Sequence, residues 1–411
     1  MACNRLMRIL VVPPLDGADE CLVSGCVEAL EAQGHTVHCM QLTSFRSGAN
    51  AVTLLPVSLN RKQQLEELAV DLISQSVVAV AEQMQAEMVL AFPRSPVSRG
   101  ARNALSELNI LSCLWMTEDF AEFPYWRLAI EGYDIVATIQ HEPFISEVSL
   151  QEHTAVYLPF AANGACCIPV CTHTAADGLI VVLGDASPDL CEALAPFVDR
   201  GMIIWGEGWD KEELFASGYQ GKLSSLTRSQ RKALYSDAAI IVNLHSTDIG
   251  NGDYINRETF AIAACGGFQL VDRRTLMEGM FGYDELVMFE STKELAELLN
   301  EFIDDSAGRR EYARNAQRTV LAKHTYLHRM EKLVEAVEEK RSSEAAVTSQ
   351  SPCIALPENT PEELAGIVEA LKSGHGLSGT ATLEQLIDCL ECQNDQSPEG
   401  AALLFWAASH R

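Results

Sequence analysis

The chain has 411 residues, 47% of them hydrophobic and 21% charged, which is enough apolar material for two or three cored domains and excludes a mainly disordered chain. Lys and Arg number 30 against 57 Asp and Glu, so the formal net charge is −27. This balance argues against nucleic acid or an anionic membrane face as the main partner, because both require clustered cations. Small molecules and other proteins remain as expected partners.

The cysteines and the apolar runs indicate the cellular compartment of the protein. The 13 cysteines are scattered without the regular spacing of a disulfide framework, which favours a reducing environment. The apolar run at residues 9–12 ends at Pro13 and Pro14 and is too short for a signal-peptide core. No run approaches the ~18 uncharged apolar residues of a membrane helix. We therefore expect a cytoplasmic protein with no integral membrane segment.

Short apolar runs alternate with helical patterns in the first part of the chain, as in β-α units on a parallel sheet. Strands are expected at residues 7–12, 36–42, 88–92, 110–115, 135–139 and 155–158. Asn60 is expected to cap a long helix that faces this sheet through Leu65, Leu68, Ala69, Leu72, Ile73 and Val80. Residues 1–165 are therefore predicted to form a Rossmann-like, doubly wound domain.

A second α/β series follows a Gly-rich and Pro-containing linker at residues 161–176. Its strands are expected at residues 179–184, 202–205, 238–244 and 267–271, and its helices at 257–265, 295–303 and 325–339. Thr227 with Gln230 and Ser291 with Glu294 have the spacing of capping boxes, which begin helices. Residues 177–340 are therefore predicted to form a second Rossmann-like domain, and the two domains are expected to face a cleft.

The C-terminal tail has a different composition. Residues 341–358 are rich in Ser, Ala and Thr without periodicity and are predicted to be a linker. Thr360-Pro361-Glu362-Glu363 is a strong helix start, and residues 359–411 are expected to form a small helical appendage of three amphipathic helices. Three short helices alone are not expected to be stable, so we expect them to dock on the rest of the chain or on another protein.

The segment at residues 240–272 has the most specific pattern for a binding site. An apolar strand ends in Asn243 and His245, a polar loop follows at Asp248–Asp253, and a helix begins near Arg257. This order would place backbone N–H groups and a cation beside a bound phosphate. Ordinary packing of an α/β unit explains the same periodicity equally well.

Glycines mark further candidate positions around this segment. Gly266 and Gly267 would let the helix approach the next strand closely. In the turn Trp205-Gly206-Glu207-Gly208-Trp209, the glycines permit close approach of a ligand and a tryptophan could stack on a base; a plain turn with two packed tryptophans is the alternative. Gly184 ends a strand at the edge where α/β sheets bind ligands.

Two stretches of the sequence resemble a known family. Residues 110–160 contain Leu-Trp-Met-Thr-Glu-Asp-Phe, Pro-Tyr-Trp-Arg, Glu-Gly-Tyr-Asp and Thr-Ile-Gln-His-Glu-Pro-Phe, and residues 235–330 end in His-Thr-Tyr-Leu-His-Arg-Met. These motifs are similar to those of the spore-maturation CgeB family of glycosyltransferase-like proteins, over most of residues 1–340. The resemblance implies a GT-B architecture of two facing Rossmann-like domains. It also implies a nucleotide-sugar donor on the C-terminal domain and an acceptor on the N-terminal one.

Ala261 departs from the donor motif of that family. Relatives read Asn-x-Arg-x-Phe-Glu before an Ala-x-x-Gly segment, and the Glu is expected to accept hydrogen bonds from the ribose diol. Here Ala261 stands at that place, with Arg257 and Glu258 before it. Glu258 lies on nearly the same helix face and could replace the missing carboxylate, or it is a solvated carboxylate at a helix start. An active transferase and a catalytically silent binding or scaffold protein are therefore both open.

Glu118 and Asp119 follow the strand at residues 110–115 and would face the acceptor side of the cleft. Inverting glycosyl transfer needs a base for the acceptor's proton, and Asp119 is the candidate, although loop carboxylates are often only solvated. The sequence has no Asp-x-Asp triplet, so we expect a metal-independent enzyme without a cofactor. Helix N-termini and Arg257 would then stabilise the departing diphosphate of a UDP- or GDP-type donor.

Two groups of cysteines are candidates for metal sites. Cys166, Cys167, Cys171 and His173 lie close together but lack the separated pairs of structural zinc sites, so free thiols in a linker are favoured. Cys389 and Cys392 have no second pair and are assigned to packing within the tail. No metal site is expected.

Overall fold

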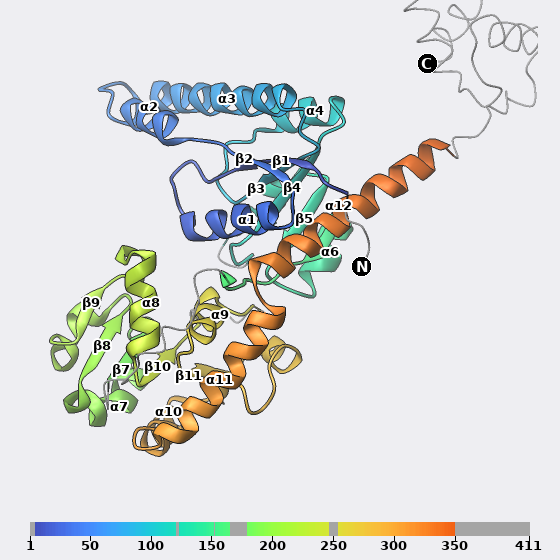
Figure 1. The fold of residues 1–411 in the computed structure, drawn as a ribbon. Coiled ribbons are helices and arrows are strands. Elements are labelled where there is room, and N and C mark those ends of the chain that lie inside the picture. The colour runs from blue at the N-terminus through green and yellow to red at the C-terminus, as the bar shows by residue number, and fades with distance from the viewer. Residues whose placement is uncertain (1–4, 121–122, 152, 165–178, 246–253, 350–411) are drawn as a thin grey trace, which may run out of the picture. The chain divides into compact units, whose positions relative to one another are not determined.

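The structure is built on two six-stranded parallel sheets with helices packed against them (Figure 1). The computed structural model describes residues 5–349 except 121–122, 152, 165–178 and 246–253. Met1–Val337 form one compact unit that contains both sheets, and Glu338–Arg411 form another. The predicted α/β class with two doubly wound domains is confirmed. Among the residues described, none of the helices combines the length and apolar character that crossing a bilayer requires.

The first sheet has the strand order β2-β1-β3-β4-β5-β6, with every pair parallel. Its strands are β1 (Arg8–Val12), β2 (Thr36–Cys39), β3 (Met88–Ala91), β4 (Leu111–Met116), β5 (Ile135–Thr138) and β6 (Thr154–Tyr157). Its helices are α1 (Glu20–Ala32), α2 (Thr43–Thr53), α3 (Leu59–Gln83), α4 (Arg99–Glu107), α5 (Trp126–Ile130) and α6 (Phe144–Ser149). Each predicted strand of this domain is present; β3, β4 and β5 are fully buried, whereas the edge strands β2 and β6 are largely half-buried or exposed.

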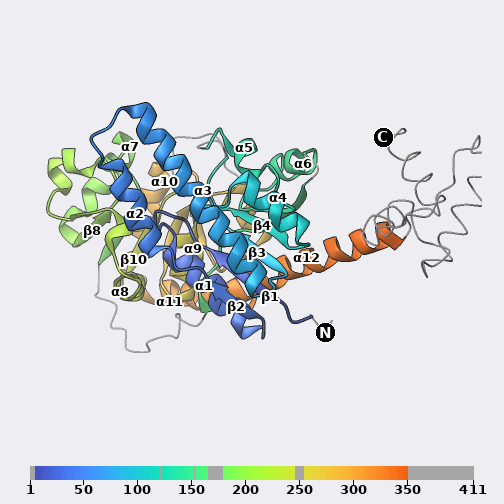
Figure 2. The same ribbon diagram turned by 90° about the horizontal axis from the view of Figure 1, so that it is seen from above.

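The prediction for α3 was wrong in two respects. Its N-cap is Ser58 rather than Asn60. Leu65, Leu68 and Leu72 were expected to face the sheet but are exposed, whereas Ile73 is buried. Only the second half of the helix covers the sheet, and its first half runs beside α2 (Figure 2). Periodicity identified an apolar face but could not show where along the helix a partner ends.

The second sheet has the order β12-β11-β10-β7-β8-β9 and is also entirely parallel. Its strands are β7 (Ile180–Leu183), β8 (Met202–Trp205), β9 (Tyr219–Gly221), β10 (Ile240–Asn243), β11 (Gln269–Asp272) and β12 (Val287–Phe289). Its helices are α7 (Pro188–Leu194), α8 (Arg228–Asp237), α9 (Arg257–Ala264), α10 (Thr292–Phe302) and α11 (Ser306–Lys323). The edge strands β9 and β12 were not predicted, because three residues are too few for a recognisable run.

Helix starts were partly predicted by the capping boxes. Thr227 and Gln230 form the complete reciprocal box at the start of α8. Ser291 accepts a hydrogen bond from the Glu294 N–H, but the Glu294 carboxylate accepts from the N–H of Glu290 instead of from the cap residue. The second helix start is therefore confirmed with one half of the box.

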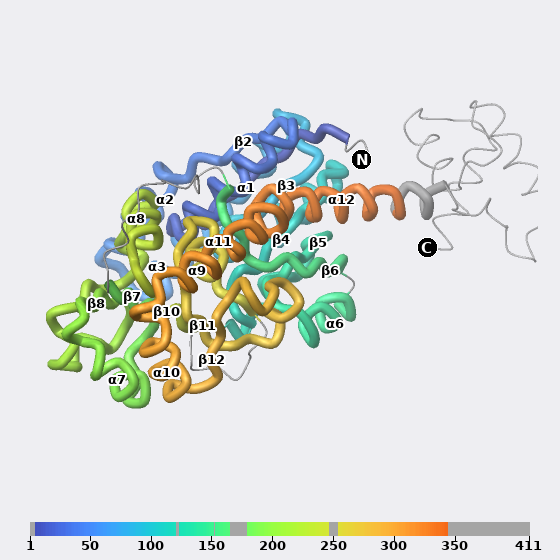
Figure 3. The backbone as a smooth tube through the Cα atoms, turned by 60° about the horizontal axis from the view of Figure 1, so that its bottom comes forward, coloured from blue at the N-terminus to red at the C-terminus, as the bar shows by residue number. Residues whose placement is uncertain are grey.

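Helix α12 (Tyr326–Ser349) returns the chain to the first sheet (Figure 3). Met330, Leu333 and Val334 of this helix are buried in one cluster with Ile9 and Leu158. The helix also continues through Arg341, where the linker at residues 341–358 was expected, so that prediction was wrong as far as Ser349. The expected appendage at residues 359–411 lies outside the described residues, as do Cys389 and Cys392.

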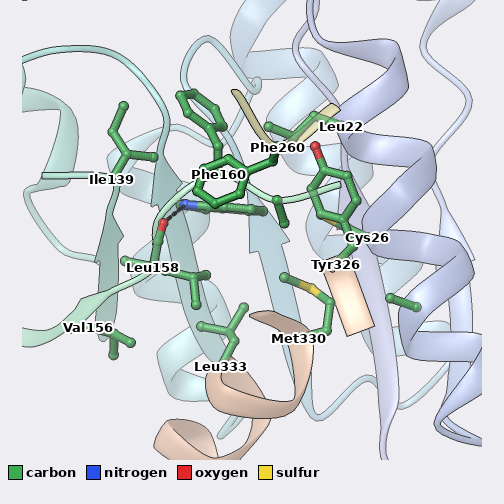
Figure 4. Packing of buried hydrophobic residues seen from close by; sticks show 14 of the residues in the cluster. Leu22, Cys26, Ile139, Val156, Leu158, Phe160, Phe260, Tyr326, Met330 and Leu333 are labelled. Carbon is green, nitrogen blue, oxygen red and sulfur yellow. Dashed lines mark hydrogen bonds between the residues drawn. The ribbon is translucent and has the colours of Figure 1, made fainter. Parts of the chain in front are cut away.

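One hydrophobic cluster runs through both sheet domains. Figure 4 shows Leu22 and Cys26 of α1, Phe260 of α9 and Tyr326 of α12 gathered beside Phe160. The His-Thr-Tyr-Leu-His-Arg-Met segment joins the domains through its backbone and its arginine. Thr325 forms an isolated parallel β-bridge with Ala162, and the Arg329 guanidinium donates to the carbonyls of Pro159 and Phe160. The conspicuous motif at residues 324–330 is therefore structural.

Gly25 allows α1 to pack on the Tyr326 ring. A Cβ atom at Gly25 would lie 2.5 Å from ring carbon Cδ2 of Tyr326. We expect Gly25→Ala to lower the free energy of unfolding by about 1 to 3 kcal/mol through overpacking. Gly48→Ala in α2, where a Cβ would meet nothing within 4 Å, is the matched control and should be neutral or stabilising by up to about 1 kcal/mol. Denaturant unfolding measures both, and equal stability of the two variants would contradict the packing argument.

His324 should make stability pH-dependent. Burial, with the Arg329 charge nearby, lowers its pKa from 6.5 to about 4. Between these values the unfolded chain binds a proton that the folded chain does not, so stability falls as the pH is lowered from 6.5 to about 4 and is not further affected by this group above or below that window. We expect His324→Gln to reduce the slope of unfolding free energy against pH in this window. The exposed His38→Gln is the control, and an unchanged slope in the His324 variant would refute the assignment.

Candidate functional site

The strand order of the second sheet reverses between β7 and β10, and a cavity of about 360 Å³ opens at the carboxyl ends of these strands. In open parallel sheets, ligands bind at such a reversal. The predicted donor residues that line this cavity, here named the sheet-end cavity, are Gly184, Trp205, Gly206, Asn243, His245 and Glu258. The structure therefore brings together residues from three strands and from the start of α9. The loop predicted at Asp248–Asp253 lies outside the described residues.

His245 is a structural anchor of this cavity. Its Nδ1 lies 2.7 Å from Asp272 Oδ1, and its Nε2 accepts the backbone N–H of Asn256 at 2.9 Å. Because Nε2 accepts, the ring proton is on Nδ1 and is donated to Asp272. Both ring nitrogens are thus used to join the end of β10 to β11 and to the start of α9.

Asn243, the last residue of β10, has a similar role two residues earlier. Its Nδ2 donates to Thr259 Oγ1 and to Gln269 Oε1, each at 3.0 Å, and its Oδ1 accepts from Asn256 Nδ2 at 2.9 Å. The side chain is 1% exposed. Asn256 in turn caps α9, because its Oδ1 accepts the Thr259 N–H. Asn243 and His245 therefore position the N-terminus of α9 at the cavity.

Arg257 was predicted beside a phosphate, but in the structure it pairs with Asp19 of the N-terminal domain. Its guanidinium also lies over the Phe160 ring, 5.2 Å from the ring centre. Burial alone would lower the pKa of Arg257, but the carboxylates of Asp19 and Glu258 raise it, and the net shift is upward. Nothing in the sequence pointed to Asp19, because the pair joins residues that are far apart in the chain.

The turn after β8 is shaped by close contacts to β7. A Cβ at Gly206 would lie 2.0 Å from the carbonyl oxygen of Gly184, so this crossing requires glycine. Trp209 is fully buried and donates its indole N–H to the same carbonyl at 2.8 Å. Trp205 lines the cavity, and its indole N–H bonds none of the described residues. Of the two tryptophans, Trp205 is therefore the one available to a ligand.

The remaining predicted glycines are explained by positive φ angles or by close packing. Gly208 has a φ of 82° and lies outside the lining of the sheet-end cavity. Gly266 follows α9 with a φ of 74°, which is typical of a helix C-terminus. A Cβ at Gly267 would lie 2.5 Å from the Tyr235 carbonyl oxygen. Gly267 thus permits close packing of the chain after α9 on the end of α8, whereas the sequence predicted a close approach to the next strand, and neither Gly266 nor Gly267 lines the cavity.

A second cavity, of about 540 Å³, is lined by residues of α1, α8 and α9 and is here named the helix cavity. Arg257, Glu258 and Ala261 line it together with cationic residues of α8, so Glu258 belongs to both cavities. The lining residues from α8 and its N-cap are Thr227, Arg228, Ser229, Arg231, Lys232 and Tyr235. Sequence reasoning missed this basic helix face, although Arg228, Arg231 and Lys232 have the spacing of a single face.

Glu118 and Asp119, the predicted acceptor-side acids, line neither cavity. Asp119 is buried, and its Oδ1 accepts from Gln140 Nε2 at 3.0 Å. Glu118 pairs with Arg94 at 3.1 Å. Trp126, which also follows β4, is buried against Phe120 and covers the sheet. These contacts give both acids structural partners.

The charge in the sheet-end cavity is mostly negative. Asp185, Glu207 and Glu258 line it with a single cation, Lys222, in the described part of the chain. Lys222 pairs with Glu207 at 2.5 Å. Sequence reasoning missed Lys222, which directly follows the short and unpredicted strand β9.

The comparisons with known proteins agree with this architecture. Residues 188–335 match the model of a family described as glycosyl transferase-like. The fold is GT-B. No curated protein matches the chain by sequence.

The fold assignment comes from solved structures. A glycosyltransferase from Rickettsia africae has a TM-score of 0.55 and 15% identity, covering 82% of this chain and 99% of its own. Anabaena HepE in complex with UDP and glucose has a TM-score of 0.55 and 12% identity, with coverages of 81% and 100%. A UDP-forming trehalose-phosphate synthase from Burkholderia xenovorans, in complex with glucose-6-phosphate, has a TM-score of 0.51 and 11% identity, with coverages of 80% and 100%. At these identities the likeness establishes the fold alone.

Asn243→Asp tests the structural role of the Asn243 network. The substitution removes the Nδ2 donor and places a carboxylate against the acceptors Thr259 Oγ1 and Gln269 Oε1, so we expect the free energy of unfolding to fall by about 1 to 3 kcal/mol or more. The exposed Asn300→Asp is the control. A stability equal to that of the control would show that Asn243 is not held by this network.

Proposed function

We propose that the protein is a glycosyltransferase that takes its sugar from a nucleoside-diphosphate sugar. The observation that carries this proposal is the convergence of Gly184, Trp205 and Glu258 with the N-terminus of α9 at the strand reversal. The glycosyl transferase-like match covers this same part of the chain. A UDP-type donor is the first to test, because two of the similar structures are named with UDP.

In the proposed reaction, the bond between the sugar carbon C1 and the leaving phosphate oxygen breaks while an acceptor oxygen bonds to C1. The N–H groups of Asn256 and Thr259 are already held by His245 and by the Asn256 side chain, so the N–H groups of Arg257 and Glu258 at the start of α9 are the donors that would face the developing charge on the diphosphate. Arg257 is held by Asp19, which leaves the backbone as the better supported donor. No metal or cofactor is part of the proposal. The acceptor is not assigned, and the cytoplasm is the expected compartment.

Glu258 is the residue we propose for the ribose hydroxyls. It lines both cavities, whereas Ala261 lines only the helix cavity. A carboxylate at the shared wall could accept two hydrogen bonds from a vicinal diol. The base for the acceptor's proton was predicted to be Asp119, and its hydrogen bond to Gln140 gives that role no support. The finer CgeB assignment rests on the sequence motifs alone.

A catalytically silent binding protein is the second candidate. The observation that favours it is the negative lining of the sheet-end cavity, where Lys222 is already paired and Asp185 and Glu258 would oppose a diphosphate. A neutral sugar or another uncharged ligand would fit such a lining better. The two candidates therefore differ in turnover: the transferase binds a nucleoside-diphosphate sugar and transfers its sugar, whereas the silent protein transfers none.

Calorimetry with UDP, GDP and their sugars separates the two candidates. We expect one nucleotide to bind with micromolar to millimolar affinity. We also expect the sugar of the matching nucleotide sugar to be hydrolysed or transferred, more slowly than the nucleotide binds. Binding without turnover under any acceptor would support the silent protein. Absence of binding to every nucleotide would remove the transferase proposal.

Substitutions at Glu258 and Ala261 test the ribose contact. Glu258→Ala should lower nucleotide affinity at least tenfold, about 1.4 kcal/mol, with an unchanged melting temperature. The exposed Glu297→Ala in α10 is the matched control and should change neither quantity. Ala261→Glu should raise affinity only if Glu258 does not already fill the role. Full affinity in Glu258→Ala would rule out the proposed contact.

A further inference from the structure

The helix cavity is positively charged although the chain as a whole is strongly acidic. Of the described residues that line it, four are cations, Arg228, Arg231, Lys232 and Arg257, and one is an acid, Glu258. The whole chain, in contrast, has 57 Asp and Glu against 30 Lys and Arg. Cations that gather along the wall of a cavity attract anions into it.

Two of these cations are paired with acids of the N-terminal domain. Arg257 pairs with Asp19, and Arg228 pairs with Glu28 at 3.3 Å. Asp19 is the N-cap of α1, and Glu28 belongs to that helix. If these two acids and Glu258 are all counted against the four cations, one positive charge remains. The surplus charge is therefore on the other two cations of α8.

Arg231 and Lys232 are the cations that a ligand could use. Within the ranges that the structure describes, neither of them forms an ion pair. The Nε atom of Arg231 is buried, and none of the described residues accepts a hydrogen bond from it. Buried donors without an acceptor are rare in native proteins, because such a donor destabilises the folded state. A bound anion would supply the acceptor.

The rest of the cavity wall is largely apolar. Leu22 of α1, Tyr235 of α8 and Tyr326 of α12 line it and are buried. The volume of about 540 Å³ falls in the range of small-molecule sites, which is about 300 to 1,000 Å³. The cavity therefore suits a compact molecule with an apolar body and an anionic group.

We propose that the helix cavity binds a small phosphorylated molecule and that Arg231 and Lys232 bind its phosphate group. A phosphate ester carries about two negative charges at neutral pH, which suits two adjacent cations better than a single carboxylate does. The planar guanidinium of Arg231 can also donate two parallel hydrogen bonds to phosphate oxygens, one of them from Nε.

Two sources could supply this phosphate. One is the nucleotide of the proposed donor, because Glu258 lines both cavities. The other is a separate phosphorylated compound that binds beside the donor. Only the first source rests on the proposed transferase function, and the phosphate site itself does not.

Calorimetry of the full chain with phenyl phosphate and with benzoate tests the site. The two probes share a phenyl ring, but the phosphate carries about one negative charge more than the carboxylate. We expect phenyl phosphate to bind about tenfold more tightly than benzoate, because Arg231 and Lys232 both contact the phosphate. Equal affinities, or no binding of phenyl phosphate, would overturn the proposal.

The double variant Arg231→Gln, Lys232→Gln should weaken binding of phenyl phosphate by about tenfold or more. The matched control is Arg310→Gln, Arg314→Gln, which removes two exposed cations from α11 and should leave the affinity unchanged. Cooperative melting shows that the variants are folded. If the double variant does not fold, Lys232→Gln alone should still weaken binding severalfold. Undiminished affinity in a folded lining variant would refute the assignment.

Ala261→Leu tests whether the probe enters the cavity. Ala261 lines the helix cavity and not the sheet-end cavity, so a leucine there would fill the space without changing the charge. We expect this variant to bind phenyl phosphate about tenfold more weakly or not at all. An unchanged affinity would place the anion on the outer surface of α8 and would contradict the proposal.

Titration of phenyl phosphate into protein saturated with UDP distinguishes the two sources. Loss of phenyl phosphate binding would support the nucleotide's own phosphates as the ligand, and independent binding would support a separate phosphorylated compound. If no nucleotide binds, the transferase proposal fails, but the phenyl phosphate titrations of the original chain and its variants still decide whether the helix cavity is a phosphate site.

Discussion

The hydrogen bond from the Asn256 N–H to His245 Nε2 determines where α9 begins, and much of the molecule depends on that position. Asp272 orients the His245 ring, and Asn243 holds the Asn256 side chain, so a buried polar network closes the space between β10, β11 and the helix. Both cavities are lined by the first turn of this helix. Its residue Phe260 lies in the cluster that also contains α1 and α12. A shift of α9 would therefore alter the site and the core together.

Much of the fold could be predicted from the sequence, because buried strands in parallel sheets are continuous apolar runs. The runs at β1, β3 and β10 were recognised in this way, and the capping residues of α8 located its start. The short edge strands β9 and β12 were not predicted, since three residues are too few to show a hydrophobic pattern. Exposure of Leu65 and Leu68 also escaped, because amphipathic spacing shows that a helix has an apolar face but not that the molecule covers it.

The sequence predicted that certain residues would gather at the sheet-end cavity, but it did not predict what those residues contact. Motif spacing placed Asn243, His245 and Glu258 at one edge of the sheet, because the carboxyl ends of parallel strands meet there. The hydrogen bonds that occupy Asn243 and His245 depend on Gln269 and Asp272, whose positions follow from the strand order. The pairing of Arg257 with Asp19 depends on how two domains pack, which no local pattern records.

The return of α12 to the first sheet has a consequence for the order of folding during synthesis. Met330, Leu333 and Val334 fill the cluster formed by strands near the N-terminus, so one face of that sheet is incomplete while the second domain is being made. Domains generally fold as units in the order in which they leave the ribosome. Here the domain that is translated first is completed last. Its apolar face must wait for the residues that follow Thr325, and any truncation of the chain before α12 would leave that face open to solvent.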